Sequence, residues 1–443
     1  MHIKKLFIII LCLGLLIENS YGEGNTQLDS LEKILNTLPE IELVPAYNQL
    51  SKIYLKTDTE KSLSYGGKAL ELSEKFNKKD EIAKAQLNIA NAYYEMSRYQ
   101  PAIEYYEKAL EYFYEQKSNN IKIYIYTRLG HAERNLGNYN NALFNYEKPL
   151  NLYLLDKDIA ISEAYNNIGV VYKLMGEYQQ ALTYHQKALS EANQQLDQFN
   201  ISTTLNYIGS LYWNISRYDS SIFFYQKALD IKKKINDVEG QAMILNNIGL
   251  VFKDRGHFQE ALEYHQKALN INSRINNKKE IGNTYNLIGN VYLQINNVDY
   301  ALNFYNRSLN LRKSINDLEG IAQSQKNIAL VYRRHNDNKR ALDFMKKALL
   351  NYKKIGNKVS IASCLNHIGN IYQRANVLDL ALENYLNALK LRQEVGDQSQ
   401  IAKSLNNIGI IYDEINNYKK ALDFYKQSLE IKESLGDDKE TAY

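Results

Sequence analysis

An asparagine recurs at a fixed spacing along the chain, always three residues before a position that usually holds glycine. Its amide offers a hydrogen-bond donor and an acceptor, although asparagine is only a middling helix former. A row of such amides could hold the backbone of an extended peptide without reading its side chains. Composition is the alternative explanation, because the chain is rich in asparagine and Lys326 interrupts the row. The candidate ligand-binding residues are Asn166, Asn206, Asn246, Asn286, Asn366 and Asn406.

A second candidate set follows seven or eight residues after these positions. Its cations would favour acidic peptides or a free C-terminal carboxylate, and Trp213, the only tryptophan, would be a rigid apolar anchor. The alternatives are a solvated helix face balanced by nearby acids, and a tryptophan that fills the core between neighbouring repeats. The set comprises Lys173, Trp213, Lys253, Arg333, Arg334 and Arg374, with Arg134 upstream.

The titratable residues do not form a catalytic or metal site. The histidines after His2 are scattered, with no pair at ligand spacing on one helix and no cysteine partners. His185 and His265 occupy a place that Tyr225 takes in another copy of the pattern, so we interpret them as packing substitutes. No paired carboxylates recur beside a unique pocket, and no glycine-rich phosphate loop is present. We therefore predict no catalytic residue, no metal and no cofactor; a hydrolase would need a convergent pocket.

The spacing of the candidate residues reflects an internal repeat of 40 residues. Weaker copies place their small residue at Ala90 and Gly130, and a degenerate copy has Leu50 there, so about ten repeats cover residues 41–435. One step is 39 residues long, and Pro149 in that repeat predicts a distorted helix. The clearest copy is YNNIGVVYKLMGEYQQALTYHQKAL, and the clear copies begin at Tyr165, Leu205, Leu245, Tyr285, Gln325, Leu365 and Leu405.

Each repeat predicts two antiparallel helices. Ile168, Gly169 and Tyr172 share one helical face, and the alanines of the second half recur at the same helical spacing. Glycine inside a helix costs about 1 kcal/mol relative to alanine, so its regular return indicates close packing between the two helices. The predicted N-caps of the following first helices are Asp237, Asp317 and Asp397.

These motifs resemble the tetratricopeptide repeat family in its 40-residue form, over about nine-tenths of the chain. The chain departs from the pattern at Ala329, which replaces the glycine, at Glu133, which replaces the usual aromatic residue, and around Leu50. The resemblance implies an all-α, right-handed superhelix. Its first helices would line a concave groove that holds peptides or partner proteins, with the recurrent asparagines facing the groove.

Composition supports an all-α chain that can bury a core. Among 443 residues there are only 4 prolines and 21 glycines, and hydrophobic residues make up 45%. The net charge of +4 is spread along the chain, which argues against nucleic acid as a partner.

The first residues resemble an export signal. Lys4 and Lys5 precede an apolar run over residues 6–17, and residues 1–22 end with the small residues of a cleavage site. An uncleaved anchor is the alternative, since the run is short for a membrane span. We expect a periplasmic or secreted chain with a capping segment at residues 23–40 and no membrane span after cleavage. Removal of Cys12 would leave Cys364 as the single thiol, so no internal disulfide is expected.

Two functions follow from this organisation. The leading one is a non-catalytic scaffold that binds a protein or peptide segment, with a preference for acidic segments. The other is suggested by residues 436–443, which repeat the start of a first helix. Similar exported arrays form the sensing region of bacterial signalling proteins that continue into a histidine kinase or a transcriptional regulator, and the chain would then be a truncated sensor region.

Overall fold

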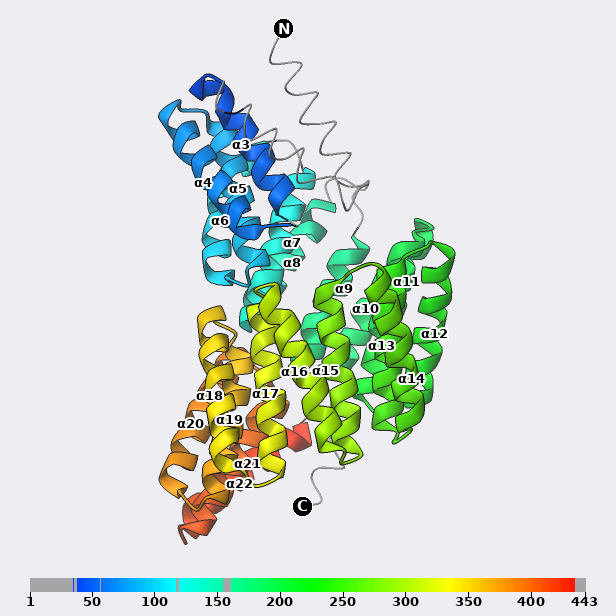
Figure 1. The fold of residues 1–443 in the computed structure, drawn as a ribbon, viewed down its shortest axis with the longest axis vertical. Helices are drawn as coiled ribbons and strands as arrows, with labels where there is room; N and C mark the ends of the chain where they lie inside the picture. Colours follow the sequence, from blue (N-terminus) through cyan, green and yellow to red (C-terminus); the bar gives the residue numbers. More distant parts are fainter. Residues whose placement is uncertain (1–34, 36–37, 56, 117–118, 154–160, 435–443) are drawn as a thin grey trace. The chain divides into compact units, whose positions relative to one another are not determined.

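The computed structural model describes residues 35, 38–55, 57–116, 119–153 and 161–434. The expected signal segment, most of the capping segment and the start of a further repeat lie outside these residues. Every regular element in the described residues is an α-helix, as the sequence predicts (Figure 1). The chain divides into two compact units, residues 1–132 and 133–443.

The first unit is built from helix pairs, α3 with α4 and α5 with α6, and α7 runs across the unit boundary. Its helices are α3 (Glu40–Tyr54), α4 (Thr59–Lys75), α5 (Lys79–Glu95), α6 (Tyr99–Tyr114) and α7 (Asn119–Leu136).

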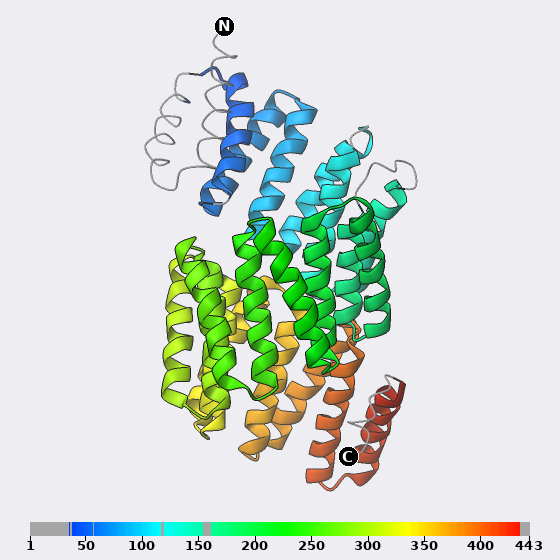
Figure 2. The same cartoon turned by 90° about the vertical axis from the view of Figure 1, so that its right-hand side faces the viewer.

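The second unit continues the same pairing, and each pair packs against the next one along the chain (Figure 2). Pro149 lies inside α8, in the repeat whose spacing is irregular. The helices are α8 (Tyr139–Tyr153), α9 (Ser162–Leu174), α10 (Tyr178–Gln194), α11 (Gln198–Asn214), α12 (Tyr218–Lys234), α13 (Val238–Asp254), α14 (Phe258–Arg274), α15 (Lys278–Gln294), α16 (Val298–Ser314), α17 (Leu318–Arg334), α18 (Asn338–Ile355), α19 (Lys358–Arg374), α20 (Leu378–Val395), α21 (Gln398–Glu414) and α22 (Tyr418–Ser434).

Asparagine and aspartate shape the turns between helices. Asn236 adopts a left-handed conformation with φ of 55°, and asparagine holds the equivalent place in about half of the described turns of the second unit. Asparagine adopts this backbone conformation more readily than most other residues, which explains why asparagine is frequent in these turns. Asp237 then accepts a hydrogen bond of 2.8 Å from the Gly240 amide. The predicted N-caps at Asp317 and Asp397 are confirmed in the same way.

The recurrent glycine makes room for a ring on the second helix of its own pair. A Cβ atom at Gly289 would lie 2.6 Å from Cε1 of Tyr305, whose side chain is fully buried. His185 fills the same place beside Gly169, which confirms the histidine as a packing substitute. The sequence correctly indicated close packing, and the side chain that the glycine admits is the ring sixteen residues later. The small residue of the second helix also lies close, since the Ser221 hydroxyl donates to the Gly209 carbonyl oxygen at 2.8 Å.

A buried cation alternates with a neutral residue at the end of the second helices. Lys232 is only 2% exposed and its ammonium lies 2.6 Å from the carboxylate of Asp237. Arg312 pairs with Asp317 in the same way two repeats later. In the repeat between them the two places hold Asn272 and Asn277. The aspartates therefore cap the next helix and also neutralise a buried charge, whereas the asparagine at the intervening repeat only caps.

None of the described helices combines the length and the apolar content that a membrane crossing requires.

We predict that Gly289→Leu destabilises the second unit by roughly 1 to 3 kcal/mol, because the new side chain must displace the Tyr305 ring. Denaturant titration followed by circular dichroism measures the change. Gly67 provides the control, since a Cβ atom at this helical position meets nothing within 4 Å. Gly67→Ala should leave stability unchanged or slightly raised. Equal stability of Gly289→Leu and the wild type would contradict the assigned packing.

We also predict that Asp237→Asn costs on the order of 3 kcal/mol, because it keeps a helix cap but leaves the buried Lys232 without its counter-charge. The double variant Lys232→Asn with Asp237→Asn copies Asn272 and Asn277 and should recover most of the loss. Chemical denaturation of the single and double variants gives the coupling free energy. A double variant that is no more stable than Asp237→Asn would show that the ion pair is not the cause.

Candidate functional site

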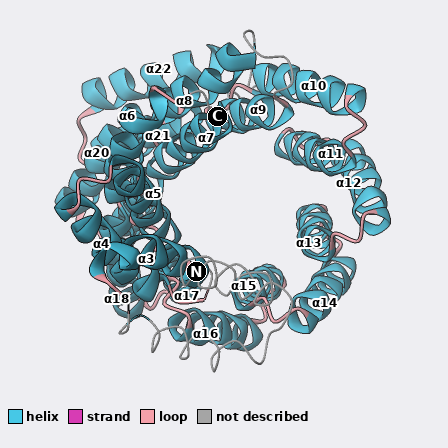
Figure 3. Cartoon of the chain, turned by 90° about the horizontal axis from the view of Figure 1, so that it is seen from above, coloured by secondary structure: helices cyan, strands magenta, loops and turns pink. Residues whose placement is uncertain are grey.

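The first helices of the pairs lie on the inner side of a curve. From α9 to α16, Figure 3 places α9, α11, α13 and α15 inside and their partners α10, α12, α14 and α16 outside. We call the stripe of the first helices that points away from the second helices the inner face. On α13 this stripe carries Met243, Asn247, Leu250 and Asp254, which are spaced by three or four residues and are all at least partly exposed.

The recurrent asparagines lie beside the inner face, mostly buried between successive first helices. Asn166 is 2% exposed, and Asn206, Asn246 and Asn286 are buried as well. Asn366 and Asn406 are half-buried in the last two complete repeats.

Their amides bond to the next repeat. Nδ2 of Asn166 donates to the Thr204 hydroxyl at 2.7 Å, and Nδ2 of Asn246 donates to Thr284 at 2.9 Å. Asn286 makes the equivalent bond to Ser324 at 3.2 Å.

At two junctions the bond runs in the opposite direction: the place 38 residues after Asn206 holds Ile244, and the hydroxyl of Ser404, 38 residues after Asn366, accepts from Arg392. Oδ1 of Asn206 accepts from Nδ2 of Asn247 at 2.9 Å, and Oδ1 of Asn366 accepts from Asn407 at 3.0 Å. A peptide that used the recurrent amides would have to compete with these bonds. On α11, α13 and α15 the residue one place later is the more accessible one, because Tyr207, Asn247 and Leu287 are partly exposed, and the sequence analysis did not single it out.

Two histidines complete the amide network. Nδ1 of His185 lies 3.1 Å from Oδ1 of Asn166, and Nδ1 of His265 lies 3.0 Å from Oδ1 of Asn246. Since both amide oxygens accept, the proton sits on Nδ1, and each Nε2 is a buried acceptor with no partner among the described residues. Burial, followed by the charge of Lys173, lowers the pKa of His185 to about 3. Burial and Lys253 lower that of His265 to about 4.

Trp213 and Lys173 contact the neighbouring first helix, whereas Lys253 pairs within its own helix. The Trp213 indole packs on a core cluster that extends from α10 to α14, and its Nε1 donates to Asp254 at 2.8 Å. Lys253 forms an ion pair of 2.8 Å with the same carboxylate. Lys173 donates to the Ser210 hydroxyl at 3.0 Å, and burial lowers its pKa. The indole therefore sits between repeats, with its polar edge bound.

The candidate arginines come together at α17 and α19. Arg374 donates to the carbonyl oxygen of Arg333 at 3.4 Å, and Nη1 of Arg333 lies 3.5 Å from Nδ1 of His367. Burial, and then the charge of Arg374, lowers the pKa of Arg333. Arg334 instead donates to the carbonyl oxygen of Leu293 at 2.6 Å. The structure thus brings Arg333 and Arg374 together and engages Arg334 with the preceding repeat.

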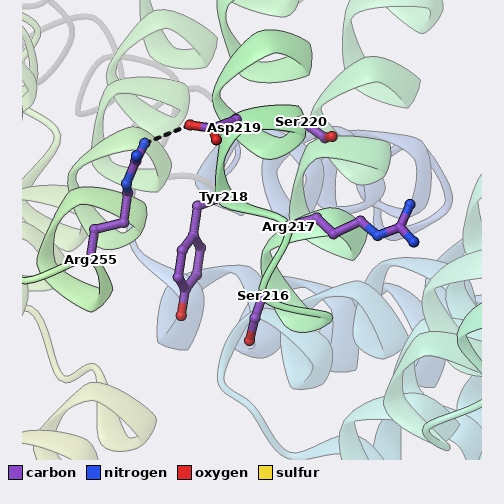
Figure 4. Close-up of a pocket in the computed structure, with 6 residues that line it drawn as sticks. All are labelled: Ser216, Arg217, Tyr218, Asp219, Ser220 and Arg255. Carbon is purple, nitrogen blue, oxygen red and sulfur yellow. Dashed lines mark hydrogen bonds and ion pairs between the residues drawn. The ribbon is translucent and has the colours of Figure 1, made fainter.

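The described residues contain no group of three or more His, Cys, Asp or Glu side chains placed to hold a metal ion. An open pocket of about 300 Å³ lies at the turn between α11 and α12 (Figure 4). Arg255 closes one side by donating to Asp219 at 2.8 Å, and no predicted site residue lines it. The inner face is therefore the better candidate for a functional site.

We predict that acid destabilises the second unit through the two buried histidines. The unfolded chain takes up protons below about pH 6.5, while the folded histidines stay neutral down to about 4 and about 3. The contribution of these histidines to the free energy of unfolding should therefore be fully present above about pH 6.5. Below this pH, the free energy of unfolding should fall by up to about 1.4 kcal/mol per pH unit for each histidine. Unfolding titrations at several pH values between about pH 7 and pH 4.5 measure this slope.

The matched control is His185→Tyr with His265→Tyr, which installs the residue that Tyr225 and Tyr305 provide elsewhere. The wild type should lose stability more steeply than this double variant. Identical slopes would refute the predicted histidine contribution.

Three known proteins are similar to parts of the chain. The photosystem I assembly protein Ycf3 of Synechococcus sp. (strain CC9311) is 41% identical over 68 residues, which cover 15% of this chain and 38% of that protein. A Rap protein solved with competence and sporulation factor is 13% identical, with a TM-score of 0.52 over 90% of this chain and 99% of that one. The Rap conjugation regulator of plasmid pLS20, solved with the Phr* peptide, is 16% identical, with a TM-score of 0.50 over 80% and 96%.

The chain spans less than two fifths of the curated relative's length, and the two Rap structures are too distant in sequence to show more than the fold. The family model for the tetratricopeptide repeat matches residues 42–115, 122–194, 160–234, 200–274, 240–314, 280–354 and 360–434. Helix pairs, spacing and family model agree, and the chain belongs to the tetratricopeptide repeat family.

Proposed function

We propose that the chain is a non-catalytic scaffold that binds a peptide or protein segment on the inner face of its second unit. The observation that carries this proposal is a partly exposed residue that recurs at the same place on five first helices, α11, α13, α15, α19 and α21. Together these residues combine hydrogen-bonding side chains with the apolar Leu287, which suits an extended segment that crosses several repeats. The residues are Tyr207, Asn247, Leu287, His367 and Asn407.

Apolar exposure on the same face supports the proposal. Met243 is 42% exposed on α13, one helical turn before Asn247. Leu250 follows on the next turn of the stripe and is partly exposed. Two Rap proteins with this fold were solved with competence and sporulation factor and with the Phr* peptide, respectively. A surface of this kind would bind peptide backbone by amides and side chains by apolar contact.

The proposal also assigns ligand contacts to the recurrent asparagines and the candidate cations. Asn366 and Asn406 are the most accessible of the six asparagines and would contribute to ligand binding first. Arg333 and Arg374 would favour acidic ligands. The basic and apolar start of the chain supports an exported location, and N-terminal sequencing of the protein from an exported fraction would test it.

Selection from a displayed peptide library against the full chain tests the binding function. Peptides selected by the wild type should lose about ten-fold or more in affinity for Met243→Arg and Leu250→Arg, because a charge replaces an apolar contact. The matched control is Phe223→Arg, which changes an apolar residue that is 53% exposed on the outer helix α12. Affinity lost in the control but kept in both inner-face variants would refute binding on the inner face.

A further inference from the structure

Exposed cations gather at one edge of the array, where each second helix ends and the next first helix begins. The last turns of α12, α14 and α16 and the first turns of α13, α15 and α17 contribute to this edge. Among these described turns, Glu239 is the one acid that is fully exposed. We call this surface the basic edge. Its exposed cations are Lys233, Lys234, Arg274, Lys278, Lys279 and Lys313.

The other acids of the basic edge are engaged within the fold. Asp237 pairs with the buried Lys232, and Asp317 pairs with the buried Arg312. Glu280 is only partly exposed and accepts a hydrogen bond from an amide of its own helix. None of the six exposed cations forms an ion pair with a described residue. The basic edge therefore presents a net positive charge to its surroundings.

The opposite edge of the same repeats carries a different balance of charge. There the first helices end and the second helices begin, from α11 to α16. Arg255 at this edge donates to Asp219 at 2.8 Å, so part of its charge is neutralised (Figure 4). Exposed acids outnumber exposed cations, so the positive charge belongs to one edge and not to the repeats as a whole. The cations are Arg217 and Arg255, and the acids are Asp219, Asp254, Glu260 and Asp299.

Exposed apolar side chains adjoin the basic edge in the preceding junction, between α10 and α11. Leu196 is 78% exposed and has a left-handed φ of 54°. Later junctions hold asparagine or glycine at this place, as at Asn236 and Gly356, and both residue types adopt the conformation more readily. Phe199 is 54% exposed, and Val238 in the next junction is 42% exposed. Leu196 thus contributes little to the core despite a disfavoured backbone, so stability does not explain it.

The apolar side chains and the cations form one continuous surface. Nζ of Lys232 lies 3.8 Å from the centre of the Phe199 ring, so this ring borders the next junction. Over three successive junctions the exposed surface changes from apolar to cationic. The first two positions of the three first helices hold Gln198 and Phe199, Val238 and Glu239, and Lys278 and Lys279.

Lys278 and Lys279 are also unfavourable for local stability. They occupy the first turn of α15, where the helix dipole disfavours positive charge. Both are exposed, so burial does not compensate for this position. Exposed residues that oppose the local preference of the backbone or the helix are typical of surfaces that contact a partner.

We propose that the basic edge, together with Leu196, Phe199 and Val238, binds the surface of an anionic lipid bilayer. The cations lie against the lipid phosphates, and the apolar side chains enter the region between headgroups and acyl chains. Nucleic acid would match the cations but offers no apolar layer for an exposed leucine. The proposal goes beyond peptide binding, because it concerns an edge of the array and leaves the inner face to a peptide.

Co-sedimentation of the full chain with vesicles tests the proposal. The vesicles are made of phosphatidylcholine alone or of phosphatidylcholine and phosphatidylglycerol in equal parts. The wild type should bind the anionic vesicles about ten-fold or more tightly than the neutral ones, and high salt should reduce this preference. Equal affinity for the two kinds of vesicle, or binding to neither, would overturn the proposal.

Two variants separate the apolar contribution from the charge. Leu196→Asn copies Asn236 and removes the disfavoured leucine, so it should keep or raise thermal stability while reducing affinity for anionic vesicles about five-fold. Lys278→Gln with Lys279→Ser copies residues 398 and 399 and should reduce this affinity about ten-fold or more. Peptides that bind the inner face should keep their affinity for both variants, which also shows that the fold is retained.

The matched control is Lys419→Gln with Lys420→Ser, which removes two exposed cations from the first turn of α22 at the opposite edge. This control should change affinity for anionic vesicles less than about two-fold. Equal losses in the two double variants would contradict binding at the basic edge, and wild-type affinity in Leu196→Asn would contradict apolar insertion. Binding to duplex DNA without binding to anionic vesicles would assign the cations to nucleic acid and overturn the lipid assignment.

Discussion

A helix pair of this chain cannot bury its apolar surface until the next pair stacks on it. The core cluster that extends from α10 to α14 shows the result, since it takes residues from three successive repeats. Stacking brings the first helices side by side, and this contact forces the buried amides of one repeat to find partners in the next. It also leaves one stripe of each first helix uncovered. The inner face is thus a by-product of the same packing that stabilises the array.

The repeat made most of the fold predictable. Glycines, alanines and aspartates that return every 40 residues gave the helix pairs, the close contact at Gly289 and the caps at Asp237, Asp317 and Asp397. These features depend on residues that are close in sequence or on a spacing that is constant. The ring beside each recurrent glycine was not predicted, because the spacing within one repeat does not reveal which face of the second helix packs against the first helix.

The site was less predictable, because its geometry depends on the angle between successive repeats. The recurrent asparagines lie a fraction of a helical turn away from the inner face, and only the stacked structure shows that Asn166 meets Thr204. The hydroxyl 38 residues further on was a usable signal in the sequence. Arg333 and Arg374 were singled out as cations, but the contact between them could be recognised only from the structure, where Arg374 donates to the carbonyl oxygen of Arg333.

The amide bonds also give each junction its own identity. Asn166 and Asn246 meet a threonine, Asn286 meets a serine, and Asn206 accepts from another asparagine. Hairpins this similar could dock onto the wrong neighbour during folding. A junction shifted by one hairpin would set Asn206 against a different polar group and strand amides in an apolar setting. Small differences among otherwise similar junctions thus disfavour the docking of a hairpin onto the wrong neighbour.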